Sequence, residues 1–252
     1  MILMSMNVQP RDPSKATPLR PGKFLVALDN HISKLQSNLQ PRPFCYNQQH
    51  DASEVLGYVL DDLFSAGVER SVVCSSFATS YRCQACGITK PAFTNDVAES
   101  ILNLEVCQSI STALMQRLSG SLVTRYCDEC RSDQICVEML SFINLPDILI
   151  LRLRRDQFVR NQGGGRIAEQ VNCDRCLTVG LGEGGNTPPA TYHLVAVCRH
   201  TGQSLASGHF LTTLVDPHSE NKWEYNDPSV SKTSALDPWS AYIFFYRKEK
   251  RR

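Results

Sequence analysis

The apolar residues in the first part of the chain have the spacing of helices. Between positions 24 and 39 they recur at steps of three and four, and Pro41 and Pro43 follow. This pattern predicts one helix whose buried face consists of Phe24, Leu28, Ile32, Leu35 and Leu39.

A second helix is predicted to begin at Asp51. Aspartate is a favoured N-cap residue, and Glu54 three positions later completes the pattern of a capping box. Gly67 is expected to end the helix. Its buried face is predicted to consist of Val55, Val59 and Leu63.

Beyond position 70 the pattern changes to short runs rich in serine, threonine and valine, which is typical of strands. One helix is predicted at 109–118, with Gly120 at its C-terminal stop. Strands are predicted at 135–145, 148–153, 193–200, 209–216 and 241–246. The glycines and prolines of 161–189 indicate surface loops around one weak strand. Helices followed by mostly antiparallel strands indicate an α+β fold.

The composition and the net charge limit which binding partners and which cellular compartments we expect. The formal net charge is +1 over 252 residues, which gives no reason to expect nucleic acid or a membrane as a partner. No apolar run approaches the roughly 18 residues of a membrane span, and the start of the chain lacks the pattern of a signal peptide. Eleven cysteines in such a chain favour a reducing compartment, the cytoplasm or the nucleus.

Two Cys-x-x-Cys pairs predict a structural zinc site. They are Cys83 with Cys86 and Cys127 with Cys130, separated by 40 residues. Zinc prefers four thiolates in a tetrahedron, and each Cys-x-x-Cys turn can supply two of them. The alternative is that these cysteines pack as small apolar residues without a metal. A zinc ion with four cysteine ligands has no open position for water, so catalysis would require other residues.

A third pair, Cys173 and Cys176, lies in a loop beside a strand and has no second pair to complete a metal site. We interpret its spacing as coincidence.

Several ordered motifs resemble the ubiquitin-specific proteases, a family of papain-like cysteine proteases that remove ubiquitin. QHDASEVL (49–56) resembles the family's Gln-Gln/His-Asp-Ala-x-Glu-Phe-Leu box. LPDILILRLRR (145–155) resembles a family strand, although Asp156 stands where phenylalanine normally follows. The segments YHLVAVCRHTG, SGHF, WEYNDPSV and AYIFFYRK resemble the histidine box and the closing strand. The four-cysteine ribbon matches the family's zinc fingers.

The resemblance implies a papain-like cysteine protease fold with a helical thumb, an antiparallel β palm and zinc-ribbon fingers. In this chain we expect a flexible leader (1–21), a ubiquitin-specific-protease-like domain (22–248) and a basic tail (249–252). The domain would divide into a partial thumb (22–68), fingers (69–145) and a palm (146–248).

The resemblance also implies roles for individual residues. His209 would be the general base, and Asn226 would orient its imidazole, with Asp227 as the other candidate for that role. Gln49, Asp51 and Gly208 would line the channel for the C-terminal tail of ubiquitin. Four further histidines, His31, His193, His200 and His218, are interpreted as having no catalytic role.

The family's nucleophile belongs to a Gly-Asn-Thr-Cys box, and these 252 residues contain no such sequence. Cys45 is the only cysteine before Gln49, and it lacks the preceding Asn-Thr. It also lies only four residues before the Gln-His-Asp box that begins at Gln49. We therefore expect a domain that is inactive alone, either truncated or without catalysis. Whether the chain is an enzyme stays open. The reaction of the family is thiol-dependent hydrolysis after the C-terminal glycine of ubiquitin; the alternative is a non-catalytic domain that binds ubiquitin or another partner. We expect a monomer.

Overall fold

A computed structural model describes residues 26–30, 32, 45, 48–92, 97–159, 163–181, 188–204, 207–217, 219 and 221–250. The predicted leader, most of the predicted helix at 24–39, His31, His218 and positions 251–252 lie outside these residues. None of the helices described is long and apolar enough to cross a membrane.

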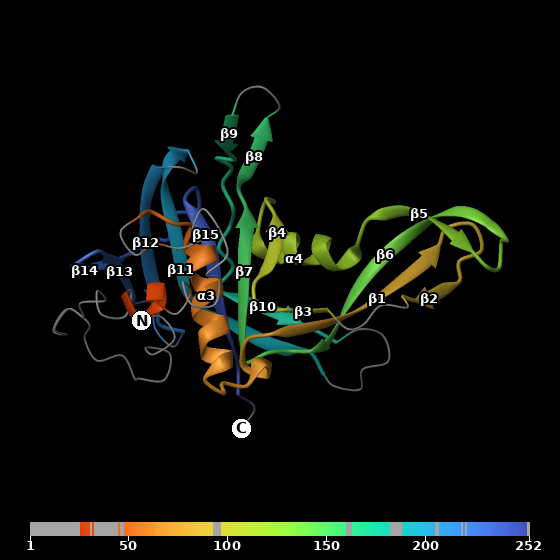
Figure 1. Ribbon diagram of the computed structural model, residues 1–252, viewed down its shortest axis with the longest axis horizontal. Helices are drawn as coiled ribbons and strands as arrows, with labels where there is room; N and C mark the ends of the chain where they lie inside the picture. The colour runs from red at the N-terminus through yellow and green to blue at the C-terminus, as the bar shows by residue number, and fades with distance from the viewer. Residues whose placement is uncertain are drawn as a thin grey trace.

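Two β-sheets form most of the structure and lie side by side along its long axis (Figure 1). The smaller is antiparallel and has the order β2-β1-β6-β5, with β3 also paired to β1. It extends away from the rest of the chain, as the fingers would. Its strands are β1 (Ser75–Cys83), β2 (Thr89–Pro91), β3 (Val97–Glu99), β5 (Leu122–Cys127) and β6 (Ser132–Asn144).

The larger sheet has the order β14-β13-β12-β11-β15-β7-β4, with β10 also paired to β11. Its pairs are antiparallel except β4 with β7, which the sequence did not indicate. Its strands are β4 (Leu102–Glu105), β7 (Ile148–Arg154), β10 (Cys176–Val179), β11 (Ala190–Ser204), β12 (Ser207–Val215), β13 (Lys222–Asn226), β14 (Ser229–Thr233) and β15 (Ala241–Lys248). A separate hairpin consists of β8 (Asp156–Val159) and β9 (Gly163–Arg166).

Helix α3 (Ala52–Ser65) begins where the sequence predicts, because the Asp51 side chain accepts a hydrogen bond from the Ser53 backbone N–H. It ends at Ser65, with Ala66 as the C-cap, and the following Gly67 has a φ of 94°, a left-handed conformation that glycine adopts readily. Helix α4 (Ile110–Ser119) is capped by Ser109 and lies between the two sheets (Figure 1). The other helical residues described are 26–30 and 32, which precede α3, and the short 3-10 turn η2 (Arg70–Val72).

The predicted buried face of α3 is incomplete. The helix packs on two sides, and the fully buried residue is Leu60, which the helical pattern did not single out. Ala52, Leu56, Leu60 and Phe64 pack against the larger sheet. Val55, Tyr58 and Val59 pack instead against Leu28 and Ile32, which are buried on the preceding helical segment. A helix between two neighbours needs a wider apolar surface than the single stripe assumed from the sequence.

Arg155, at the end of β7, is only 1% exposed and binds four backbone carbonyls. Nε donates to Ala241 at 2.7 Å, and Nη1 donates to Ile167 and Glu169, both at 2.9 Å. Nη2 donates to Pro238 at 3.2 Å. Burial lowers the pKa of this guanidinium to about 10, so it stays charged at neutral pH. The side chain therefore links the loop after β9, at Ile167 and Glu169, and the loop before β15, at Pro238, to the end of the larger sheet.

We expect Arg155→Met to lower the free energy of unfolding by about 3 kcal/mol or more, because it leaves several buried carbonyls without donors. Urea unfolding measures the loss. The adjacent Arg154 provides a matched control, since its side chain is 60% exposed and pairs at 2.9 Å with an exposed Glu105. Arg154→Met should cost no more than about 1 kcal/mol. Equal losses in the two variants would contradict the role of Arg155.

Candidate functional site

Strands β12 and β13 bring His209 and Asn226 together. His209 is in β12, and Asn226 is the last residue of the neighbouring β13. His209 Nε2 lies 2.7 Å from Asn226 Oδ1, a hydrogen-bond distance. An amide oxygen only accepts hydrogen bonds, so in this contact Nε2 carries the proton and Nδ1 is the acceptor nitrogen of the neutral ring. The catalytic role of the pair stays a prediction.

Asp227 is the more distant of the two candidate orienting residues. Its Oδ2 lies 3.9 Å from His209 Nε2, and its side chain is 71% exposed. Its φ of 49° belongs to the turn between β13 and β14, which directs the chain away from the strand. The geometry therefore favours Asn226 as the hydrogen-bond partner of the imidazole.

Gly208 cannot carry a side chain, because a Cβ there would lie 2.1 Å from His200 Nε2 and 2.6 Å from the backbone oxygen of Thr201. His200 is 7% exposed, and its ring centroid lies 4.6 Å from that of Phe210. Burial lowers the pKa of His200, which favours the neutral ring. This buried histidine beside the predicted base was not singled out from the sequence, which carries no signal of its packing.

Asp51 caps α3 and also binds the larger sheet. Its Oδ2 accepts a hydrogen bond from the Tyr242 hydroxyl at 2.8 Å, and that hydroxyl also accepts one from Arg152 Nε at 2.6 Å. Burial raises the pKa of the Asp51 carboxyl, but hydrogen bonds from Ser53 and Tyr242 outweigh it and leave the pKa below its usual value. The sequence pointed to Asp51 but not to Tyr242, which lies 191 positions further along the chain.

A line of ring contacts connects Asp51 to Gly208, two of the three residues predicted to bind substrate. Tyr242 binds Asp51, and its ring centroid lies 6.2 Å from that of Phe210. Phe210 contacts His200, which packs on Gly208. The third predicted residue, Gln49, is exposed and precedes α3.

The four predicted zinc ligands meet at the tip of the fingers. Their sulfur atoms all lie within 4.8 Å of one another. Cys83 Sγ is 3.9 Å from Cys130 Sγ, and Cys86 Sγ is 3.7 Å from Cys127 Sγ. A tetrahedron with Zn–S distances near 2.3 Å has edges of about 3.8 Å, so this arrangement fits one zinc ion.

The two knuckles have the same backbone turn. Gly87 follows the first with a φ of 74°, and Arg131 occupies the equivalent position of the second with a φ of 53°. The Cys86 and Ala85 backbone N–H groups lower the pKa of the Cys83 thiol to about 6. Desolvation raises the pKa of Cys130 to about 12.

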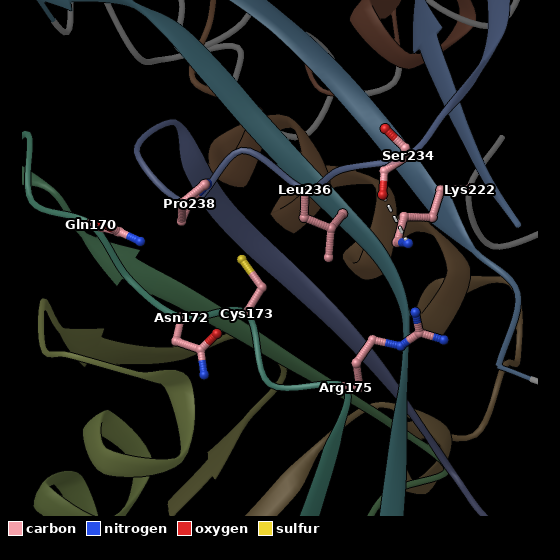
Figure 2. A pocket seen from close by; sticks show the side chains of 8 residues that line it. All are labelled: Gln170, Asn172, Cys173, Arg175, Lys222, Ser234, Leu236 and Pro238. Carbon is pink, nitrogen blue, oxygen red and sulfur yellow. Dashed lines mark hydrogen bonds between the residues drawn. The ribbon is translucent and has the colours of Figure 1, made fainter. Parts of the chain in front are cut away.

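A separate cavity of about 280 Å³ lies beside the larger sheet, away from the residues predicted to be catalytic (Figure 2). Its lining residues are Gln170, Asn172, Cys173, Arg175, Lys222, Ser234, Leu236 and Pro238. The thiol of Cys173 points into it, and burial raises the pKa of this thiol to about 11. Lys222 Nζ donates to the backbone oxygen of Ser234 at 3.2 Å.

Cys45 is half-buried, and its backbone contacts the His50 imidazole, whose Nε2 lies 2.9 Å from both the Cys45 N and O atoms. Its hydrogen bonds therefore join it to the segment before α3 rather than to His209.

Comparisons with known proteins agree with this fold. The sequence profile described as ubiquitin carboxyl-terminal hydrolase matches residues 3–246. Ubiquitin carboxyl-terminal hydrolase 48 of Danio rerio is 25% identical over 73% of this chain, and ubiquitin carboxyl-terminal hydrolase Usp2 of Drosophila melanogaster is 26% identical over 81%. This chain covers only 19% and 26% of the lengths of those two proteins.

The fold matches that of a solved deubiquitinase complex. One chain of the SAGA Ubp8/Sgf11/Sus1/Sgf73 DUB module, bound to ubiquitin aldehyde, superposes with a TM-score of 0.73 at 19% identity. The match covers 91% of this chain and 55% of that one. The papain-like fold with thumb, palm and fingers is thereby confirmed, and the chain belongs to the ubiquitin carboxyl-terminal hydrolase family, among its ubiquitin-specific proteases.

Proposed function

We propose that this chain binds ubiquitin and holds two of the three catalytic groups of a ubiquitin-specific protease. In this proposal His209 is the general base and Asn226 its orienting partner for hydrolysis of the bond after ubiquitin's C-terminal glycine. The observation that carries the proposal is the 2.7 Å contact between His209 Nε2 and Asn226 Oδ1. The nucleophilic thiol is not among the residues that we assign to the site.

The tautomer set by Asn226 suits a base. The amide oxygen keeps the proton on Nε2, which leaves Nδ1 to accept the proton of a thiol and later to return it to the leaving amine. The thiolate would attack the carbonyl carbon of the last glycine and form a thioester, which water then hydrolyses. Asn226 also stabilises the ring orientation while the imidazole is charged.

The line from Asp51 through Tyr242 and Phe210 to Gly208 supports a channel for the ubiquitin tail. The Cβ position of Gly208 is filled by the His200 ring and the Thr201 backbone oxygen, so only glycine fits this packing beside the base. We propose that Gln49, Asp51 and Gly208 contact that tail.

The fingers offer a surface for the globular part of ubiquitin. Leu122, Tyr126 and Ile135 are 65%, 56% and 52% exposed. Their register along β5 and β6 places them on the same face of the sheet, since the cross-strand partner of Ile135 is Thr124, between the other two. Exposed aromatic and aliphatic side chains gathered on one face are typical of protein-binding surfaces.

We also propose that Cys83, Cys86, Cys127 and Cys130 hold one structural zinc ion that fixes the tip of this surface. The fit of the sulfur–sulfur distances to a zinc tetrahedron supports it.

Titration of isotopically labelled ubiquitin with the full chain, followed by NMR, tests the binding part of the proposal. We expect saturable shifts, and Ile135→Asp should weaken binding about tenfold, because it places a charge in the apolar contact. Met115→Asp provides the matched control, since Met115 is 62% exposed on α4, outside the fingers sheet. Absence of saturable binding, or equal weakening by the two variants, would contradict the proposal.

A second candidate is a non-catalytic domain that binds ubiquitin or another partner. The lack of an Asn-Thr-Cys sequence in these 252 residues favours it. Both candidates predict ubiquitin binding, and they differ in whether His209 ever takes a proton from a thiol.

A further inference from the structure

Cys176, the second cysteine of the pair interpreted as coincidence, lies beside an imidazole and a carboxylate. Cys176 Sγ is 3.3 Å from His193 Nδ1. The other ring nitrogen, Nε2, is 3.7 Å from Glu249 Oε2. His193 thus lies between a thiol and a carboxylate. In such an arrangement the imidazole can accept the thiol proton, which activates the thiol as a nucleophile.

Three paired strands and a backbone hydrogen bond hold this cluster. Cys176 on β10 is the cross-strand partner of His193 on β11, and His193 is the partner of Arg247 on β15. Paired residues share a face, so Arg247 lies on the other side of His193 from Cys176. The Glu249 backbone N–H donates to the Thr191 oxygen at 2.8 Å, which fixes the carboxylate's position next to β11.

The cluster is distinct from the site at His209. His209 pairs with Thr201 on β11, eight positions beyond His193. Eight residues of a strand span about 26 Å. Cys176 is also exposed, so small reagents reach it without passing through the tail channel.

We propose that Cys176 is a nucleophilic thiol activated by His193 and positioned by Glu249, and that it is a site of oxidation by peroxides. The imidazole takes the thiol proton, and the Glu249 carboxylate stabilises the resulting imidazolium. The thiolate then attacks one peroxide oxygen, so an S–O bond forms and the O–O bond breaks. The departing hydroxide takes the proton of the imidazolium and leaves as water. Sulfur loses two electrons to the peroxide, and the product is a sulfenic acid.

Cys173 in the same Cys-x-x-Cys pair serves as an internal comparison. Its thiol points into the cavity of Figure 2 and contacts the Val171 oxygen at 3.6 Å. Burial raises the pKa of this thiol to about 11, so it remains protonated and unreactive at neutral pH. Spacing alone therefore does not decide reactivity, whereas the contacts of each sulfur do.

Treating the purified full chain with hydrogen peroxide and a dione that traps sulfenic acids, followed by peptide mass spectrometry, tests this proposal. Cys176 should be trapped about ten times faster than Cys107, a half-buried cysteine on another part of the surface, and Cys173 should be trapped more slowly still. Iodoacetamide should give the same order.

Two variants separate activation from mere exposure. His193→Gln should slow both reactions of Cys176 about tenfold, and Glu249→Gln should slow them less, while Glu69→Gln, an exposed glutamate elsewhere, should leave them unchanged. Loss of structure would expose thiols and speed labelling, so a slower rate at Cys176 cannot arise from unfolding. If Cys176 reacts no faster than Cys107, or if His193→Gln leaves its rate unchanged, the proposal is wrong.

Discussion

The full chain incubated with ubiquitin that carries a fluorogenic C-terminal amide is expected to release no fluorophore. Members of a catalytic triad act as a unit, and loss of the nucleophile alone costs about 10⁶-fold in turnover in well-studied proteases. In the proposed function His209 and Asn226 move and hold a proton, but neither forms the thioester. We therefore expect a rate at least about 10⁵-fold below that of a family member that contains the Asn-Thr-Cys box.

A ubiquitin probe with a C-terminal electrophile extends this test to each thiol. It should label none of the eleven cysteines, because the proposed tail channel would deliver the electrophile to a position where the chain presents no assigned thiol. Labelling of Cys45 that free ubiquitin suppresses would contradict this expectation and identify the nucleophile. Cys176 is the informative control here, since it should react with iodoacetamide but not with the ubiquitin probe.

A chimaera in which the Asn-Thr-Cys segment of a family member precedes this chain separates the two proposed functions. If it turns over substrate and His209→Ala abolishes turnover while ubiquitin binding persists, the catalytic proposal stands. If it binds ubiquitin without turnover, the non-catalytic alternative stands.

Local signals made much of the fold predictable. The Asp51 cap and Gly67 stop predicted the ends of α3, because both act within one helical turn. The predicted strand at 148–153 matches β7 (Ile148–Arg154), and that at 241–246 lies within β15 (Ala241–Lys248). These strands are buried on both faces and read as continuous apolar runs.

Contacts between distant segments were not predictable in the same way. The parallel pairing of β4 with β7 and the hydrogen bond between Tyr242 and Asp51, 191 positions apart, leave no local pattern. The contact between Cys176 and His193 was not predictable either, because His193 lies on another strand. The sequence around Cys176 presents only a Cys-x-x-Cys spacing. His209 and Asn226 were predictable as a pair only because several ordered motifs of one family surround them.

Removal of zinc is expected to unfold the tip of the fingers. Freshly reduced protein should contain about one equivalent of zinc, since the four sulfur atoms already have the separations of its tetrahedral ligands. Metal binding to a four-cysteine site contributes on the order of 10 kcal/mol to local folding at neutral pH. Without the ion, the two knuckles have only backbone hydrogen bonds, the exposed Lys90–Asp128 pair and the small cluster of Cys83, Cys127 and Cys136. Chelation should therefore abolish amide-exchange protection at the knuckles while the larger sheet remains protected.

Single substitutions distinguish a ligand from a neighbouring cysteine. Cys86→Ser should reduce the zinc content to well below one equivalent and reproduce the loss of protection. Cys136 provides the control, because it is 3% exposed and packs beside Cys83 and Cys127 but does not belong to the group of four sulfur atoms. Cys136→Ala should retain about one equivalent of zinc and lose stability only through the small cavity. Elemental analysis that finds no zinc in the unaltered, freshly reduced protein would refute the site, and equal loss in both variants would refute the assignment of its ligands.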